Sequence, residues 1–566
     1  MIIRERLRSM PKQLTATNEK PTAVWEDVRA FLRRPRRGTA MMRLAPARQY
    51  IASLLGLVIC GFAFVLRAID VGGTITTNTV WTSALPIHVI TNVTVPTNIT
   101  LTIQAGALVQ LGRNISIVAQ DGGTIDVAGT TMEPVLFRSL NGTNNWRRVG
   151  ADGTNATLTM RHADIEHGQT AVLNAASGLF EMCYFHDYDG TDFPTIYNQP
   201  ILVTESASSL IVRACHFRNY YETLFRSGVI VIEDSLFEDI VGDGIDFDTA
   251  APGSVIRRCT IRHGTLTNVD AVDLGSQSIG VLVENCLMYD FPFDKGVSVG
   301  EGSSDITVRS CVIYGVDTGI AVKDSSAAAI VNNTIADSNY GLRLYEKNAG
   351  QGGGQAVAWN NILWSNTNSI ALLNLSTIAL SYSDVAGGSL YPGTGNSNAD
   401  PMFLDAAVHD YRLTTTSPAI GSGTNGATLG ALFPVGSFLV DTDGDSLPDT
   451  WELTYDMDFN NPANAAADPD ADGLSNLQEY LAGTNPRNAS SVLKASLRTN
   501  SSGARLLEFS AAANKSYTIE YRGSLGIGAW AKLAEIDAVP SERLEEWPID
   551  LNGPMRLFRI LVSQPR

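Results

Sequence analysis

Charged side chains are scarce in this 566-residue chain, where Asp, Glu, Lys and Arg make up 17%, against roughly 25% in an average globular protein. Among the charged residues after residue 49, the basic ones are fewer, with 29 Lys and Arg against 54 Asp and Glu. This balance leaves no basic stripe for a nucleic acid, and we predict no nucleic-acid partner. With 50 glycines and so little charge, the composition favours a β-rich, turn-dense protein over a helical one.

Long apolar runs are also absent, apart from one uncharged stretch, IASLLGLVICGFAFVL at Ile51–Leu66. At 1.5 Å per helical residue it is short for a hydrocarbon core of about 30 Å, and it suits the apolar region of a secretory signal. The preceding residues carry 12 Lys and Arg and only 4 Asp and Glu. We therefore predict a basic leader or cytoplasmic segment over residues 1–50 and a signal peptide over 51–68. An uncleaved membrane anchor stays open as the alternative, and both hypotheses predict a secreted or cell-surface protein.

Cysteine is rare too, and five of the six cysteines fall into a repeat. Segments such as SLIVRACHF, GVLVENCLM and DITVRSCVI each place a small polar or thiol residue two positions before an apolar one. The equivalent positions, 20 to 32 residues apart, are Cys183, Cys215, Ser235, Cys259, Cys286, Cys311, Asn333 and Asn361. A column of equivalent positions favours buried, reduced thiols over disulfides. Bridges Cys259–Cys286 or Cys286–Cys311 remain the alternative, because adjacent coils lie within bridging distance.

A second ladder follows the first in each repeat and fixes the register. A Gly or Ala precedes an apolar residue predicted to point inward, at Ile245, Val272, Val297, Ile320 and Leu342. A period of 20 to 30 residues with several short β-branched runs is what one coil of a parallel β-helix needs. The sequence therefore predicts an all-β protein with a parallel β-helix solenoid over residues 74–435.

This region resembles the right-handed parallel β-helix superfamily, which includes pectate lyases, polygalacturonases and many exported bacterial surface proteins. The coil repeat carries the resemblance, together with the entry VPTNITLTIQAGALV and the closing stretch DPMFLDAAVHDYRLTTTSPAIGSG. The resemblance implies the fold, whereas the scaffold hosts lyases, hydrolases, adhesins and stalks alike.

The predicted register places acidic residues in columns on the outer surface. Asp246 over Asp273, and Asp243 over Asp270, would each bring two carboxylates to about 5 Å. Like charges at that distance raise a pKa or recruit a cation such as Ca²⁺. Lys295, Lys323 and Arg343 occupy nearby ladder positions as a base or charge clamp. These seven residues form the candidate catalytic patch, and ordinary solvated turn positions are the competing interpretation.

The sharpest local motif follows the solenoid, where DTDGDSLPDTWE and DPDADGLSNLQE lie 27 residues apart within residues 441–487. Oxygen ligands at positions 1, 3, 5, 7, 9 and 12 wrap one Ca²⁺, and the last is a glutamate on the following helix. The predicted ligands of the first loop are Asp441, Asp443, Asp445, Leu447, Asp449 and Glu452. Those of the second loop are Asp468, Asp470, Asp472, Leu474, Asn476 and Glu479. The pair resembles the thrombospondin type 3 and EF-hand-like loops of exported bacterial proteins, although Ser446 replaces the turn glycine in the first loop.

Residues 492–566 alternate apolar and polar side chains and predict a small C-terminal β-sandwich. For the whole chain we predict a calcium-stabilised surface protein whose solenoid binds polysaccharide or another cell-envelope partner. The alternative is a polysaccharide lyase or glycoside hydrolase that acts through the acidic patch, with Ca²⁺ and a Lys or Arg base. A net negative body repels polyanions unless Ca²⁺ bridges them, so a neutral glycan is as good a candidate as an acidic one.

Overall fold

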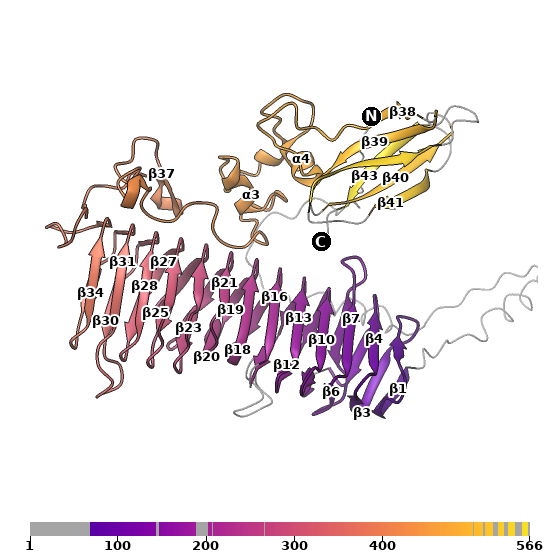
Figure 1. The fold of residues 1–566 in the computed structure, drawn as a ribbon, viewed down its shortest axis with the longest axis horizontal. Helices are drawn as coiled ribbons and strands as arrows, with labels where there is room; N and C mark the ends of the chain where they lie inside the picture. The colour runs from indigo at the N-terminus through magenta and orange to yellow at the C-terminus, as the bar shows by residue number, and fades with distance from the viewer. Residues whose placement is uncertain are drawn as a thin grey trace, which may run out of the picture.

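The computed structural model describes residues 68–142, 146–187, 202–205, 208–264, 266–501, 503–512, 515–523, 530–536, 541–549 and 557–563. Most of these residues form one solenoid of parallel strands, drawn from indigo to salmon in Figure 1. The all-β parallel β-helix is thereby confirmed. The predicted leader and apolar segment up to residue 67 lie outside the described residues. Within the described ranges, no helix has the length and apolar character that crossing a bilayer requires.

Each coil contributes three short strands, and each strand pairs in parallel with its equivalent in the next coil. The first strands of the coils are β2 (Thr79–Trp81), β4 (Thr100–Gln104), β7 (Thr124–Ala128), β10 (Thr157–Arg161), β13 (Ser177–Glu181), β16 (Ser209–Arg213), β21 (Val255–Arg257), β24 (Leu282–Glu284), β26 (Ile306–Arg309), β28 (Ala327–Val331), β31 (Gln355–Trp359) and β34 (Thr377–Ser381).

The second strands are β5 (Leu108–Leu111), β8 (Val135–Ser139), β11 (Ala163–Glu166), β14 (Tyr184–His186), β17 (His216–Tyr220), β19 (Leu236–Ile240), β22 (Thr260–Gly264), β29 (Thr334–Ala336), β32 (Ile362–Trp364) and β35 (Asp384–Val385). The third strands are β6 (Ser116–Gln120), β9 (Arg148–Asp152), β12 (Gln169–Leu173), β15 (Leu202–Thr204), β20 (Ile245–Ala250), β23 (Val272–Gly275), β30 (Tyr340–Tyr345) and β33 (Asn368–Leu372). Longer strands run through a corner and serve two positions, namely β1 (Ile69–Thr74), β3 (Ile87–Val95), β18 (Leu224–Glu233), β25 (Leu287–Val299) and β27 (Val312–Lys323).

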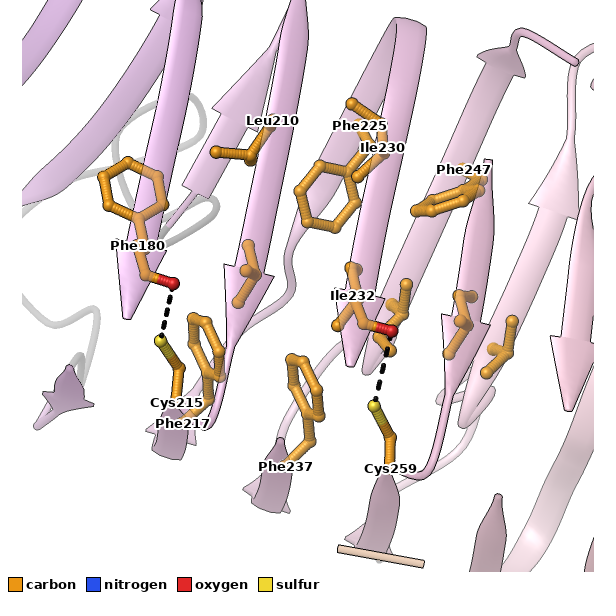
Figure 2. Packing of buried hydrophobic residues seen from close by; sticks show 14 of the residues in the cluster. Phe180, Leu210, Cys215, Phe217, Phe225, Ile230, Ile232, Phe237, Phe247 and Cys259 are labelled. Carbon is orange, nitrogen blue, oxygen red and sulfur yellow. Dashed lines mark hydrogen bonds between the residues drawn. The ribbon is translucent and has the colours of Figure 1, made fainter. Parts of the chain in front are cut away.

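The interior of the solenoid is a continuous apolar core built from stacked equivalent residues. Phe185, Phe217 and Phe237 stack with ring centroids 4.7 and 4.6 Å apart and planes within 1°. Figure 2 shows this core, with the Cys215 and Cys259 thiols directed at the Phe180 and Ile232 carbonyls. All five described cysteines are buried and free, so the reduced column is confirmed and the alternative disulfides are wrong.

The first strands also carry an alternating charge ladder on their outer side. Backbone pairing aligns seven residues of alternating sign, Arg161, Glu181, Arg213, Glu233, Arg257, Glu284 and Arg309. Glu233 is almost fully buried and accepts hydrogen bonds from Arg213, Arg257 and Arg258. Because each coil offers the charge that its neighbour needs, the ladder avoids like charges in adjacent coils.

The coils end at Val385, and residues 401–440 run back along the second strands as a strap. The strap contains β36 (Phe403–Asp405), η1 (Ala406–Val408), β37 (Asp410–Leu413) and η2 (Thr424–Gly426). Ala431 N donates to Thr334 Oγ1 (3.0 Å), and Ser437 N donates to Thr260 Oγ1 (2.9 Å). The stretch predicted as the end of the β-helix is therefore the strap that covers its side, in orange in Figure 1.

Two short helices and two small sheets complete the described chain. Each acidic loop precedes a helix as predicted, α3 (Asp449–Thr454) and α4 (Asn476–Ala482), with η3 (Asn464–Ala466) between them. The C-terminal strands are β38 (Ser496–Thr499), β39 (Arg505–Ala511), β40 (Ser516–Arg522), β41 (Ala531–Ile536), β42 (Arg543–Pro548) and β43 (Leu557–Ser563). They form two three-stranded antiparallel sheets, β38-β39-β42 and β41-β40-β43, whose buried apolar residues share one cluster.

Candidate functional site

The predicted patch lies on the third-strand face. This face consists of the outward-facing residues of β20, β23 and β30, those of the third-position parts of β18, β25 and β27, and the turns that lead into these strands. Asp246 pairs with Asp273, and the same column continues through Ser298 and Ala321 to Arg343. The inward neighbours Ile245, Val272, Val297, Ile320 and Leu342 are aligned in register and fully buried. Since side chains alternate along a strand, the column points away from the core. The register expected from the sequence is confirmed.

Three carboxyl groups gather at one end of this face. One oxygen from each of Glu222, Asp243 and Asp246 lies within 4.8 Å of the others. Burial, strengthened by the neighbouring Asp273 charge, raises the pKa of Asp246 to about 9. Burial and Asp273 likewise raise the pKa of Asp243 to about 7. Burial and Asp243 raise the pKa of Glu222 to about 7. The acid cluster, meaning Glu222, Asp243 and Asp246, therefore takes up protons or a cation near neutral pH.

A separate ion pair lies beside the acid cluster and ties the loops of adjacent coils. Lys295 Nζ donates to Asp270 Oδ1 at 2.9 Å and also contacts Asp294. Asp270 N in turn donates to Asp243 Oδ1 at 2.7 Å. Burial disfavours the Lys295 ammonium, but Asp270 and Asp294 outweigh it and raise its pKa. Lys295 is thus held as a cation, which suits a charge clamp better than a base.

Lys323 and Arg343 extend the face toward the later coils. Lys323 is 2% exposed, and its aliphatic chain covers Gly300, where an added Cβ would collide with it. A side chain at position 300 would therefore require the end of Lys323 to move. The Arg343 guanidinium lies 4.6 Å from the Tyr340 ring centre and 4.9 Å from that of Tyr345. Asp317 Oδ2 lies 3.9 Å from Arg343 Nη1, at the limit of an ion pair.

Buried polar atoms without a partner mark the same column. Among the described residues, Asp273 Oδ1, Ser298 Oγ and Arg343 Nε are shielded from solvent and find no hydrogen-bond partner. Ser298 as a whole is 0% exposed. Most buried polar groups in native proteins are paired, so three unpaired atoms along one column mark it as a candidate polar site.

The first acidic loop brings Asp441, Asp443 and Asp445 together, with one oxygen of each within 4.8 Å of the others. The α3 residue Glu452 is fully buried, and its Oε2 has no partner in the described structure, nor has Asp443 Oδ2. Burial and the Asp445 and Asp443 charges raise the pKa of Glu452 to about 8. Carboxylate oxygens that converge in this way are the ligands that Ca²⁺ prefers.

The second loop repeats this arrangement with Asp468, Asp470 and Asp472. Glu479 is fully buried, and burial together with the Asp470 charge raises its pKa to about 7. Partners are also lacking, within the described chain, for Asp470 Oδ2, Asp472 Oδ2, Asn476 Oδ1 and Glu479 Oε2. Helix α4 begins with a capping box in which Ser475 and Gln478 bond reciprocally, and this fixes where Glu479 points. The residues of both loops fit a Ca²⁺ ion.

Glu222 and Asp294 were missed at the sequence level. Glu222 precedes Leu224, which pairs with Asp246, so it belongs to the same ladder one coil earlier. That coil has Glu222-Thr223 where the others have Gly or Ala before an apolar residue, so the ladder signal is absent there. Asp294 lies where the pairing of β25 with β27 shifts register, between Phe291 and Lys295, and a strict period cannot place it.

Comparisons with known proteins identify the solenoid but not its chemistry. A family model described as right handed beta helix region matches residues 207–385, about one third of the chain. No curated protein matches. Among solved structures, a double mutant of the periplasmic alginate epimerase AlgG is similar, with 12% identity, a TM-score of 0.34, and coverage of 54% of this chain and 76% of that one. AlgG itself gives 10% identity and a TM-score of 0.29, covering 51% of this chain and 78% of its own.

The coils and the matching family model together define a right-handed parallel β-helix protein. At such low identities and TM-scores, the likeness to AlgG says nothing of activity. The function must therefore come from the geometry of the third-strand face and the acidic loops.

Proposed function

We propose that this protein binds a polysaccharide chain along the third-strand face. The half-buried residues Asp273 and Arg343 carry the proposal, because both face outward and neither Asp273 Oδ1 nor Arg343 Nε has a partner among the described residues. Asp273 and Arg343 lie three coils apart along the solenoid axis, at about 4.8 Å per coil, so they suit an extended polymer with repeating hydroxyl or carboxylate groups. The hydroxyls of a sugar chain both donate and accept, and so serve the carboxylate and the guanidinium alike.

Calorimetric titration of the 68–566 chain with a panel of neutral and acidic oligosaccharides tests this proposal. For a ligand that binds, Asp273→Ala and Arg343→Gln should each weaken affinity about tenfold, because each removes a polar contact with the ligand worth about 1.4 kcal/mol. Arg309→Gln is the matched control, since Arg309 pairs with Glu284 in the first-strand ladder, away from this face. Equal losses in all three variants, or no binding by any glycan in the panel, would refute the proposal.

A catalytic role is the second candidate, and the acid cluster favours it. Asp246, with a pKa of about 9, holds its proton at neutral pH next to the Asp273 carboxyl, whose Oδ1 is unpartnered. A protonated acid beside a second carboxyl is the pairing that glycoside cleavage needs. Alternatively, a cation held by Glu222, Asp243 and Asp246 would acidify a proton next to a uronate carboxylate, and the charge clamp Lys295 lies beside it.

Turnover is tested by following the ultraviolet absorbance of unsaturated products and the release of reducing ends from the same panel. Both signals together indicate a lyase, and reducing ends alone indicate a hydrolase. Asp246→Asn and Asp273→Asn should abolish such activity while circular dichroism stays unchanged. Activity that persists in both variants would show that the reaction takes place at another site. If no polysaccharide in the panel gives either signal, binding without turnover is the remaining function.

We also propose that each acidic loop holds one Ca²⁺, with the ligands predicted from the sequence. The fully buried Glu452 and Glu479, each with an unpartnered oxygen, support this proposal. Calcium titration of the chelator-treated chain should show two sites, and Glu452→Gln or Glu479→Gln should each remove one. Export to a calcium-rich exterior agrees with such sites, and detection of the protein outside the cytoplasm by cell fractionation checks it.

A further inference from the structure

The short helix η3 (Asn464–Ala466) lies between the two acidic loops and contacts both. Asn464 Nδ2 donates to Glu452 Oε1 at 3.0 Å, and Glu452 closes the first loop. Next to it, Ala465 N donates to Asp445 Oδ2 of the same loop at 3.0 Å. Asn464 therefore holds the one ligand of the first loop that comes from the body of helix α3.

The same residue also holds the second loop. Asn476 Nδ2 donates to the Asn464 carbonyl at 2.9 Å, and Asn476 occupies position 9 of the second loop. Asn476 is 2% exposed, and its Oδ1 finds no partner in the described structure. With the amide nitrogen bound to Asn464, the amide oxygen stays available as the ligand oxygen of position 9.

Glu452 and Asn476 thus depend on the position of one residue. Glu452, when held by an ion, would fix the Asn464 side chain through their hydrogen bond. The Asn464 backbone would then be fixed as well, and Asn476 would be oriented before a second ion binds. Because Asn476 would already be ordered, binding of the second Ca²⁺ would cost less conformational entropy. The Ca²⁺ affinity of the second loop would therefore rise.

We propose that Asn464 is a positioning residue that couples the two loops, so that Ca²⁺ in one loop strengthens binding in the other. The coupling rests on the calcium sites proposed above. By linkage it is reciprocal, and each ion raises the affinity of the other loop by the same factor, about fivefold.

A double-mutant cycle on the full chain tests the proposal by Ca²⁺ calorimetry. Glu479→Gln disables the second loop and should weaken the first loop about fivefold. In the Asn464→Ala background, adding Glu479→Gln should leave the affinity of the first loop unchanged. A residue with a merely structural role would lower both affinities and keep their coupling, so the cycle separates the two roles. Asn488→Ala, an exposed asparagine beyond both loops, is the control and should keep the fivefold effect.

Each outcome decides a different claim. Absence of Ca²⁺ binding by the unaltered chain would refute the sites themselves. Two sites whose affinities ignore each other would leave the sites standing and refute the coupling. Coupling that survives Asn464→Ala would assign it to another residue. If Asn464→Ala does not fold, Asn464→Asp keeps the side-chain shape but faces Glu452 with a carboxylate, and it should likewise abolish the coupling.

Discussion

At the scale of single residues, the two acidic loops differ at the backbone of position 6. Ser446 adopts φ of 77° in the first loop, where the second loop has Gly473 with φ of 95°. A left-handed conformation costs a non-glycine residue roughly 1–2 kcal/mol. Ser446→Gly should therefore stabilise the first loop by about 1 kcal/mol and strengthen its Ca²⁺ binding about fivefold. Gly473→Ser should weaken the second loop by a similar factor, and calorimetry that finds no opposite trend would contradict this explanation.

The acid cluster gives a pH prediction whose sign follows from its pKa shifts. Asp246 titrates near 3.8 when unfolded and near 9 in the folded chain. Above pH 4 the unfolded chain thus binds fewer protons than the folded one, and stability falls as the pH rises toward 9. In chelator, Asp246→Asn should escape this loss. Denaturant unfolding at pH 8 should then give the variant a free energy of unfolding at least about 1.4 kcal/mol above that of the unaltered chain, which is the value of one pKa unit. A difference that does not grow between pH 5 and pH 8 would contradict it.

Residues placed by a strict period were predictable, whereas those placed by local deviation were not. Asp246, Asp273 and Arg343 follow the ladder, so their alignment could be derived from spacing alone. The rings around Arg343 and the packing of Lys323 over Gly300 depend on side-chain direction, which no period encodes. The convergence of three carboxylates in each acidic loop was the most predictable feature, because a pattern of twelve consecutive residues determines it.

At the scale of elements, the column of equivalent positions from Cys183 to Asn361 connects each coil to the next through buried polar atoms. Ser235 Oγ accepts from Cys215 N, and Asn333 Oδ1 accepts from Cys311 N. Asn361 makes the most bonds, since its Oδ1 accepts from Asn333 N and its Nδ2 donates to the Ile330 carbonyl. The cysteine thiols donate to carbonyls of their own coil and of the preceding one, as Cys286 does to Glu284 and Ile256. Asn, Ser and Cys therefore interchange in the repeat because each satisfies backbone groups at the same corner.

This difference in hydrogen bonding predicts that alanine substitutions along the column lower the free energy of unfolding by unequal amounts. Asn361→Ala leaves several buried donors and acceptors unpaired and should destabilise the solenoid by about 3 kcal/mol or more, at roughly 1–3 kcal/mol per orphaned group. Cys286→Ala removes one weak thiol donor and a small buried volume, and should cost about 1 kcal/mol. Thermal unfolding monitored by circular dichroism compares the two. Equal shifts in Tm would show that packing rather than hydrogen bonding governs the column.

At the scale of the whole molecule, the strap and the acidic loops join the solenoid to the C-terminal sheets. Ser437 binds Thr260 and the Asp234 carbonyl, and four residues later the first loop begins at Asp441. On the other side, Lys515 Nζ donates to the Tyr480 carbonyl of α4 at 2.9 Å. The sequence marked the strap only as an end segment, because its contacts join residues up to about 200 positions apart and leave no local pattern.

This arrangement predicts that removing calcium destabilises the acidic loops and the adjoining part of the strap but leaves the coils of the solenoid unchanged. Without an ion, the converging carboxylates of each loop repel one another, and Glu452 and Glu479 hold buried charge or a proton instead of a metal. Hydrogen exchange of the full chain should therefore rise in chelator over residues 441–487 and the adjoining strap residues 433–440, and stay unchanged in the core strands β20, β23 and β30. Magnesium should protect these segments less than calcium does, because it demands a smaller, octahedral site. Faster exchange spread evenly over the coils would instead mean that calcium stabilises the solenoid itself, and unchanged exchange throughout would mean that the loops hold no ion.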